Sequence, residues 1–222
     1  MDPLDRLTKD LSIYLVTDCH LAGGRPLVDI VEQAILGGAT CIQLRDKELS
    51  SRELYQLALE MRELTRAKDV PLIINDRLDI ALATGADGVH LGQDDLPAVV
   101  ARRLIPPEMI LGVSAETVQE AREARDAGAS YLGVGAVFST STKADAGKPI
   151  GLKALADVCS QVDLPVVGIG GIDAGNAARV IEAGAQGVAV VSCIVAAEQV
   201  AAAAREVARQ VQTARESRQR RP

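Results

Sequence analysis

Short apolar runs alternate with longer amphipathic stretches along the whole chain. The runs are nearly continuous and rich in β-branched residues, as in strands covered on both faces. The stretches repeat apolar positions three and four residues apart, which is typical of helices. The pattern predicts strands at 12–17, 40–45, 71–75, 88–91, 110–114, 131–134, 166–169 and 187–191. It predicts helices at 27–36, 51–67, 78–83, 98–104, 115–127, 152–161, 174–183 and 195–214.

Recurrent dipeptides mark the boundaries of these elements. A Gly-Ala pair stands just before a strand four times, at 38–39, 85–86, 128–129 and 184–185. Glycine after a helix adopts the left-handed conformation easily, so each pair predicts a helix end. Ser50-x-x-Glu53 predicts a capping box, and Pro97 fits an early helix position.

Eight β-α units without a linker predict a single-domain (β/α)₈ TIM barrel. A doubly wound sheet is the alternative, but it would break the repeat in its middle, and we find no such break. The expected domain spans residues 1–222, with a short polar lead-in and a basic C-terminal tail. We interpret the arginine-rich tail, 205–222, as a solvated helix end that frays.

Composition narrows the class of partner. The 222 residues are 48% hydrophobic but only 2% aromatic, which predicts an aliphatic core. Scarce aromatic residues and a net charge of -6 disfavour nucleic acid as a partner, because stacking platforms and a general basic field are missing. Binding of a phosphate must therefore come from a local cluster of cations.

The apolar segments and the cysteines indicate in which cellular compartment the protein works. No run has the length of a membrane span, and 1–8 is too polar for a signal peptide. The cysteines at 19, 41, 159 and 193 form no C-x-x-C pair. We therefore expect a cytoplasmic protein without a membrane partner.

Candidate chemistry concentrates where the predicted strands end, which is the working face of such a barrel. Gln43, Arg45 and Lys47 alternate, so they share one side of an extended segment. Two cations and an amide suit a phosphorylated substrate. A surface ion pair with Asp46 and Glu48 is the alternative. Function is favoured because a Gln and an Arg within a strand are costly to bury.

Asn75-Asp76 ends the third strand, and Asp94-Asp95 follows the fourth. Carboxylates from neighbouring strand ends can share Mg²⁺, whose other ligands come from water and substrate phosphate. Asp76 and Asp95 could equally be helix N-caps, and their spacing leaves both interpretations open. The cations nearby favour a magnesium-diphosphate site.

Two further segments predict anion binding. The loop at 138–149 has hydroxyls and a lysine that suit a clamp closing on a substrate, although a plain polar loop is the alternative. Glycines at 168, 170 and 171, with Val191-Ser192, suit a phosphate monoester at strands seven and eight. We interpret His90 as a satisfied core residue. Because no nucleophile or strong base is evident, we expect a substrate to supply the nucleophile.

The motifs together resemble the thiamine phosphate synthase family. The matching segments are YLVTD (14–18), GGATCIQLRDKE (37–48), INDRLDIALATGADGVHLGQDDLP (74–97), LGVSA (111–115), YLGVGAVFSTSTK (131–143) and VVGIGGI (166–172). One departure is Ser139, where many members carry Pro. The resemblance implies a TIM-barrel transferase that couples hydroxymethylpyrimidine diphosphate to a thiazole phosphate. Diphosphate leaves first, and the thiazole nitrogen captures the resulting pyrimidine methyl cation.

The resemblance also implies roles for individual residues. Asp76 and Asp95 would ligate Mg²⁺, and Arg45, Lys47 and Lys143 would be catalytic. The substrate-binding set would be Gln43, Arg45, Asp46, Lys47, Asn75, Ser114, Thr140, Ser141, Thr142, Lys143, Gly171, Val191 and Ser192. Within that set, Thr140 and Thr142 would touch the thiazole phosphate, and the last three would form its pocket.

Two other functions remain open at this point. A related thiazole tautomerase would need no diphosphate or Mg²⁺ site, and the complete QLRDK and acidic motifs count against it. A non-catalytic thiamine-phosphate carrier or sensor need not stabilise departing diphosphate. The expected partners are small molecules, and a homo-oligomer is compatible with the sequence.

Overall fold

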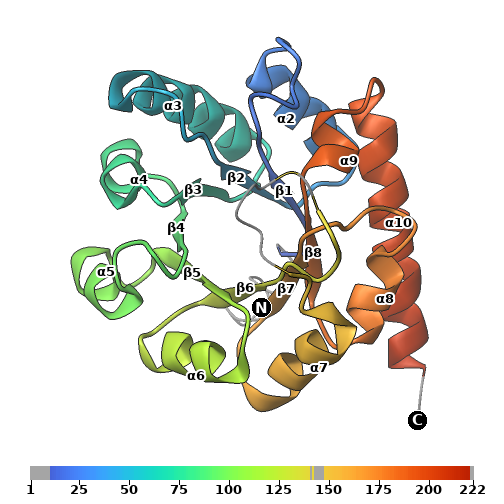
Figure 1. Cartoon of the computed structure of the whole chain (residues 1–222). Helices are drawn as coiled ribbons and strands as arrows, with labels where there is room; N and C mark the ends of the chain where they lie inside the picture. The colour runs from blue at the N-terminus through green and yellow to red at the C-terminus, as the bar shows by residue number, and fades with distance from the viewer. Residues whose placement is uncertain (1–10, 141, 143–147, 221–222) are drawn as a thin grey trace.

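Every predicted apolar run forms a strand in the computed structural model, which describes residues 11–140, 142 and 148–220. Neighbouring strands are parallel, and β8 pairs with β1 so that the sheet closes into a barrel (Figure 1). The predicted TIM barrel is therefore confirmed. The strands are β1 Ile13–Val16, β2 Cys41–Leu44, β3 Leu72–Asn75, β4 Gly88–Leu91, β5 Ile110–Ala115, β6 Tyr131–Val134, β7 Val166–Ile169 and β8 Gly187–Val190.

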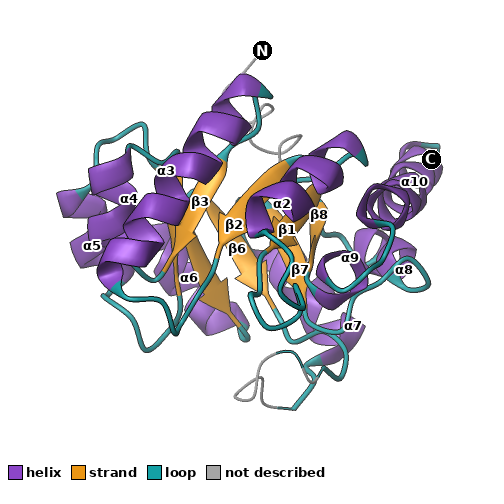
Figure 2. Ribbon diagram, turned by 90° about the horizontal axis from the view of Figure 1, so that it is seen from above, coloured by secondary structure: helices purple, strands orange, loops and turns teal. Residues whose placement is uncertain are grey.

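Helices surround the barrel and cover its outer face (Figure 2). Within the described ranges, no helix combines the length and apolar character that crossing a membrane requires. The helices are α2 Leu27–Leu36, α3 Ser51–Ala67, α4 Leu78–Thr84, α5 Ala98–Leu104, α6 Val118–Asp126, α7 Gly151–Gln161, α8 Ala177–Glu182, α9 Ser192–Val195 and α10 Val200–Gln219.

Alternation along the strands divides the core into two parts. Leu15 and Ile42 face outward and pack with the helices in a large aliphatic cluster. Tyr14, Cys41 and Tyr131 face inward and form a smaller cluster inside the barrel. The aliphatic core predicted from composition is confirmed, but two of the few aromatic rings lie together at the centre of the barrel.

The predicted boundary signals are confirmed. The glycines of the four Gly-Ala pairs all have positive φ, from 62° at Gly85 to 115° at Gly184. Ser50 and Glu53 form the predicted capping box at the start of α3. The connections from each helix to the next strand, at the amino-terminal end of the barrel, are therefore short. The longest loops, such as the one between β6 and α7, lie at the carboxyl ends of the strands.

The helix predicted at 195–214 is confirmed from Val200 onward, but its predicted start is wrong, because a break separates two helices here. The short α9 ends at Val195, and α10 begins at Val200. The guanidinium of Arg25 donates hydrogen bonds to the carbonyls of Val195 and Ala197, the latter at 2.8 Å. A side chain from another element thus satisfies carbonyls that a continuous helix would use internally.

The C-terminal tail is a helix end with mostly exposed arginines, as predicted, but two of those arginines anchor it to the barrel. Helix α10 continues to Gln219. Arg215 donates to Ser12 Oγ at 2.5 Å and to the Gln186 carbonyl. Arg218 donates to the Gly184 carbonyl at 3.1 Å. These bonds hold α10 against the amino-terminal end of the barrel.

Replacing Arg215 by Ala should lower the free energy of unfolding by about 1–3 kcal/mol, since half-buried hydrogen-bond partners lose their donor. Urea denaturation measures the change. The control is Arg209→Ala, which removes only an exposed pair with Glu206 on the same helix and should cost less than about 0.5 kcal/mol. Equal losses in the two variants would contradict an anchoring role.

Candidate active site at the carboxyl ends of the strands

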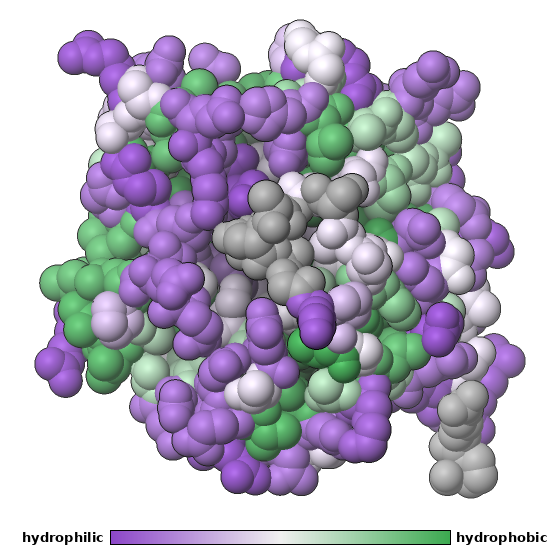
Figure 3. All heavy atoms as spheres, viewed as in Figure 1, coloured by the Kyte–Doolittle hydropathy of each residue, from purple (hydrophilic) through white to green (hydrophobic). Residues whose placement is uncertain are grey.

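A cavity of about 330 Å³ lies inside the barrel, at the carboxyl ends of the strands. Figure 3 views this face, where hydrophilic side chains surround the centre and apolar residues gather at the rim over α5. Strands β1 to β8 all contribute to the cavity wall. The predicted site residues in that wall are Gln43, Arg45, Asn75, Ser114, Thr140, Thr142, Gly171, Val191 and Ser192.

The end of β2 and the loop that follows it place the QLRDK motif (residues 43–47) across the edge of the cavity. Gln43 is buried within β2, and the strand ends one residue later, at Leu44. The hydroxyl of Thr17 accepts a hydrogen bond from the Arg45 amide at 3.0 Å, which fixes the chain where the strand ends. Lys47 is exposed, beyond the cavity wall, because the strand alternation stops before it.

Asp46 takes a local role in the loop after β2. Its Oδ1 accepts hydrogen bonds from the amides of Glu48 and Leu49, both at 2.8 Å. The alternative surface ion pair of this motif with Asp46 and Glu48 does not form among the described residues, where Glu48 instead pairs with His20. The substrate-binding role of Asp46 remains a prediction.

The carboxyl groups of Asp76 and Asp95 meet, as predicted for neighbouring strand ends. Burial and, after it, the adjacent Asp95 carboxyl group together raise the pKa of Asp76 to about 6, against the opposing effect of Lys47 and Arg45. Two adjacent, half-buried carboxyl groups repel one another when both are ionised, and a divalent cation bound between them would remove that repulsion.

The alternative interpretation of these residues as N-caps is wrong. Helix α4 starts after Arg77 and α5 after Pro97, and neither helix has a side-chain cap. Asp95 instead accepts a hydrogen bond from the Gly92 amide at 2.6 Å. Asp76 has the left-handed φ of 61°, which costs energy for any residue other than glycine. Both carboxyl groups are thus held toward one another rather than along a helix.

A chain of buried polar groups forms the floor of the cavity. Gln43 donates to the Tyr14 hydroxyl at 2.9 Å, and that hydroxyl lies 2.6 Å from the hydroxyl of Tyr131. His90 Nδ1 lies 2.9 Å from the same Tyr131 hydroxyl, and His90 Nε2 lies 2.9 Å from Ser114 Oγ. His90 is satisfied, as predicted, but it lines the cavity and is not part of the apolar core.

The floor depends on a glycine in β5. A Cβ on Gly112 would collide with the Tyr131 ring and would lie 2.5 Å from His90 Nδ1. Only a residue without a side chain leaves room for both rings beside this strand.

Replacing Tyr131 by Phe should lower the free energy of unfolding by about 1–3 kcal/mol, because buried groups on Tyr14 and His90 each lose a partner. Urea denaturation is again the measurement. The control is Tyr55→Phe on α3, which removes a hydroxyl that takes no part in these buried hydrogen bonds and should cost less than about 0.5 kcal/mol of unfolding free energy. If the two variants are equally stable, the chain of hydrogen bonds contributes nothing to folding.

The rim of the cavity opposite Arg45 and the two aspartates is built from residues that directly follow β7 and β8. Gly170 and Gly171 have φ values of 95° and 63°, and a Cβ on either would collide with the loop that follows β6. Val191 and Ser192 line the cavity beside them. The backbone can therefore approach a bound anion closely at this rim.

The loop predicted as a clamp is described in part. Thr140 and Thr142 line the cavity, and the Thr142 amide donates to Thr140 Oγ1 at 3.2 Å. Ser141 and Lys143 lie outside the described residues.

Sequence reasoning missed several residues of the wall. Tyr14, Gln93, Glu116 and Tyr131 all line the cavity. Alternation in the first strand points Tyr14 to the same face as Val16, which was a usable signal for Tyr14. Its contact with Tyr131, 117 residues away, required the closed barrel.

Comparison with known proteins identifies relatives over most of the chain. The family described as thiamine monophosphate synthase matches residues 13–194. Thiamine-phosphate synthase of Moorella thermoacetica is 56% identical over 91% of this chain and 97% of its own. Thiamine-phosphate synthase of a Roseiflexus species is 52% identical over 94% of this chain and 88% of its own.

A solved structure matches the fold closely. Thiamine phosphate pyrophosphorylase from Pyrococcus furiosus superposes with a TM-score of 0.87 at 42% identity, covering 94% of this chain and 98% of that one. A 3-hexulose-6-phosphate synthase, at 19% identity and a TM-score of 0.69, shares the fold alone.

Proposed function

The chain belongs to the thiamine monophosphate synthase family, and from this premise we propose how its cavity carries out the coupling. The enzyme joins 4-amino-5-hydroxymethyl-2-methylpyrimidine diphosphate to 4-methyl-5-(2-phosphoethyl)thiazole and releases diphosphate. The observation that carries the proposal is the meeting of Asp76 and Asp95 beside Arg45, at one edge of a cavity with a glycine rim opposite.

The diphosphate binds at the edge formed by β2, β3 and β4. Arg45 in the cavity wall and Lys47 just outside it face the two acidic residues closely enough to oppose the rise in the Asp76 pKa. A guanidinium can bind two phosphate oxygens at once, and an ammonium adds a compact charge. These cations favour the leaving of diphosphate, because negative charge accumulates on it as the bond to carbon breaks.

Asp76 and Asp95 would hold Mg²⁺. Their paired carboxyl groups fit a hard cation, since each oxygen donor is anionic and the pair is half buried. The ion would neutralise charge on the departing diphosphate. Asn75, the last residue of β3, lines the cavity beside this pair and would orient the pyrimidine diphosphate.

The floor of the cavity would hold the pyrimidine ring. Gln43, Ser114 and the buried hydroxyls and imidazole offer donors and acceptors that can match a ring with an amino group and ring nitrogens. The apolar side chains in the cavity wall, among them Val16, Ile169 and Val190, limit the access of water to the cation formed when diphosphate leaves. The thiazole nitrogen then captures the methyl cation with its own lone pair, so no base on the protein is needed.

The thiazole phosphate would bind at the opposite rim. Gly171, Val191 and Ser192 lie there, and Thr140 and Thr142 offer hydroxyls from the loop after β6. Binding of the two substrates at opposite rims places both reacting centres over the floor, which supplies the proximity that the coupling requires.

The test is a turnover assay with purified protein, both substrates and millimolar Mg²⁺, which follows thiamine phosphate and diphosphate together. We expect both products in equal amounts. Binding of thiamine phosphate without turnover would indicate a carrier and overturn the proposal.

We also place the enzyme in the cytoplasm, which its four free cysteines support.

The enzyme should need more Mg²⁺ for the same rate at acid pH. Because the pKa of Asp76 is raised to about 6, protons compete with the cation at and below that pH. The Mg²⁺ concentration for half-maximal rate should rise as the pH falls from about 7 to 5 and stay nearly level from about 7 to 8. The raised pKa also means that, without metal, ionisation of Asp76 removes stability as the pH rises toward and through about 6. A half-maximal Mg²⁺ concentration that does not change with pH would count against this site.

A further inference from the structure

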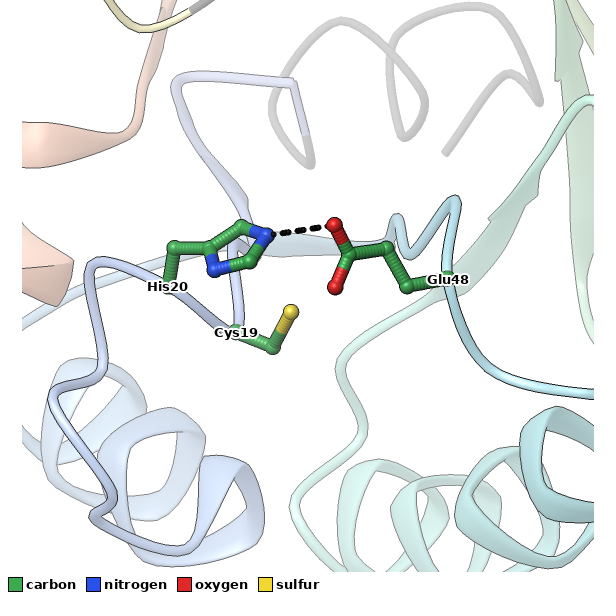
Figure 4. Close-up of side chains that lie close together, drawn as sticks. All are labelled: Cys19, His20 and Glu48. Atoms are coloured by element: carbon green, nitrogen blue, oxygen red, sulfur yellow. Dashed lines mark ion pairs between the residues drawn. The ribbon is translucent and has the colours of Figure 1, made fainter.

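A second cluster of metal-ligand side chains lies on the same face, outside the cavity. Cys19 and His20 follow β1, and Glu48 lies in the loop after β2. The Cys19 sulfur, a His20 ring nitrogen and a Glu48 carboxylate oxygen all lie within 4.8 Å of one another. In Figure 4 the three side chains converge from two loops on a common point. None of them lines the cavity.

The spacing suits a borderline-soft transition metal. A tetrahedral Zn²⁺ bonded at about 2.0–2.3 Å to nitrogen, oxygen and sulfur holds these atoms about 3.3–3.8 Å apart. His20 Nε2 and Glu48 Oε1 are 2.9 Å apart, so small side-chain rotations would admit the ion between them. The two side chains are 70% and 67% exposed, so breaking their ion pair costs little.

The surroundings of the thiol favour a cation. The pKa of Cys19 is raised to about 11, first by burial and then by the carboxylates of Asp46, Asp18 and Glu48. Against the effect of its partial burial, Asp46 has a lowered pKa, because its carboxylate accepts hydrogen bonds from the Cys19 thiol and from the amides of Leu49 and Glu48. A cation that replaced the thiol proton would lie beside the carboxylates of Asp46, Asp18 and Glu48, which would attract it.

We propose that Cys19, His20 and Glu48 bind a divalent transition metal of the Zn²⁺ class, with the fourth position open to water or another ligand. The ion would link the loop after β1 to the loop after β2, which carries Arg45 and Lys47. This site differs in its ligand atoms from the Asp76–Asp95 pair. It offers a sulfur and a nitrogen, whereas that pair offers only oxygens, so the two sites favour different metals.

The experiment uses Co²⁺ as a spectroscopic substitute for Zn²⁺, with purified, chelator-treated protein and excess Mg²⁺. Binding through a thiolate gives a sulfur-to-cobalt charge-transfer band in the near ultraviolet, which an all-oxygen site cannot give. We expect this band in the wild type and in Cys159→Ser, a matched control on α7, and its loss in Cys19→Ser. His20→Gln and Glu48→Gln should weaken Co²⁺ binding at least tenfold.

Absence of the band in the wild type, or its persistence in Cys19→Ser, would overturn the proposal. Circular dichroism checks that each variant folds, and the exposed His20→Gln gives a second reading that does not depend on the thiol. Because binding to the folded state alone raises stability, Zn²⁺ should also raise the melting temperature of the wild type and of Cys159→Ser. An equal rise in Cys19→Ser would contradict the assignment.

Discussion

The Asp76→Asn variant is expected to lose roughly 10²–10³-fold in kcat, which corresponds to about 3–4 kcal/mol of transition-state stabilisation. Asparagine keeps an oxygen at this position and tolerates the left-handed backbone that Asp76 adopts, so the fold should be preserved. What disappears is one of the two anionic ligands proposed for Mg²⁺. Steady-state kinetics at saturating substrate, over a series of Mg²⁺ concentrations, measures the loss.

The matched control is Asp79→Asn, three residues further along. Asp79 pairs with Arg77 at the surface, at 2.6 Å, and lies on α4 outside the cavity wall. This variant should retain wild-type kcat and lose less than about 1 kcal/mol of stability. If Asp76→Asn retains full activity, or if its loss follows a parallel loss of folded protein in urea denaturation, the metal role is contradicted.

The Arg45→Gln variant should lower kcat/KM for the pyrimidine diphosphate by roughly 10²–10³-fold, because glutamine cannot supply charge to the leaving diphosphate. Arg45 lies in the cavity wall at the end of β2, and its backbone is fixed by Thr17 independently of the side chain. The free energy of unfolding should therefore change by less than about 1 kcal/mol. Initial rates over a range of pyrimidine diphosphate concentrations give the effect.

Two further variants separate charge from geometry. Arg52→Gln, on the exposed side of α3, removes a cation of the same kind and should leave kcat/KM unchanged. Arg45→Lys keeps the charge but not the two-pronged donor, so its activity should lie between those of Arg45→Gln and the wild type. Equal effects at positions 45 and 52 would show that only overall charge matters.

Local patterns predicted the frame of this protein well. Apolar runs placed all of the strands within two residues of their observed ends, because strands covered on both faces leave little ambiguity. Gly-Ala pairs located helix ends through a backbone conformation that glycine adopts easily. The same local reasoning placed Gln43 and Arg45 in the cavity wall, since both lie at the carboxyl end of β2.

Long-range contacts account for what the sequence could not predict. The break between α9 and α10 depends on Arg25, some 170 residues earlier in the chain. The hydrogen bonds among Tyr14, Tyr131 and His90 form only when distant strands surround one interior. Lys47 was assigned to the same side as Gln43, but the strand ends before it.

The pairing of β1 with β8 has a consequence for how the chain folds. Ile13 lies opposite Val188, so the first strand keeps one free edge until nearly the whole barrel sequence has been synthesised. Such distant contacts slow folding, and an unpaired apolar strand edge invites association with other chains. We therefore expect the nascent chain to depend on chaperones until its last strand emerges from the ribosome.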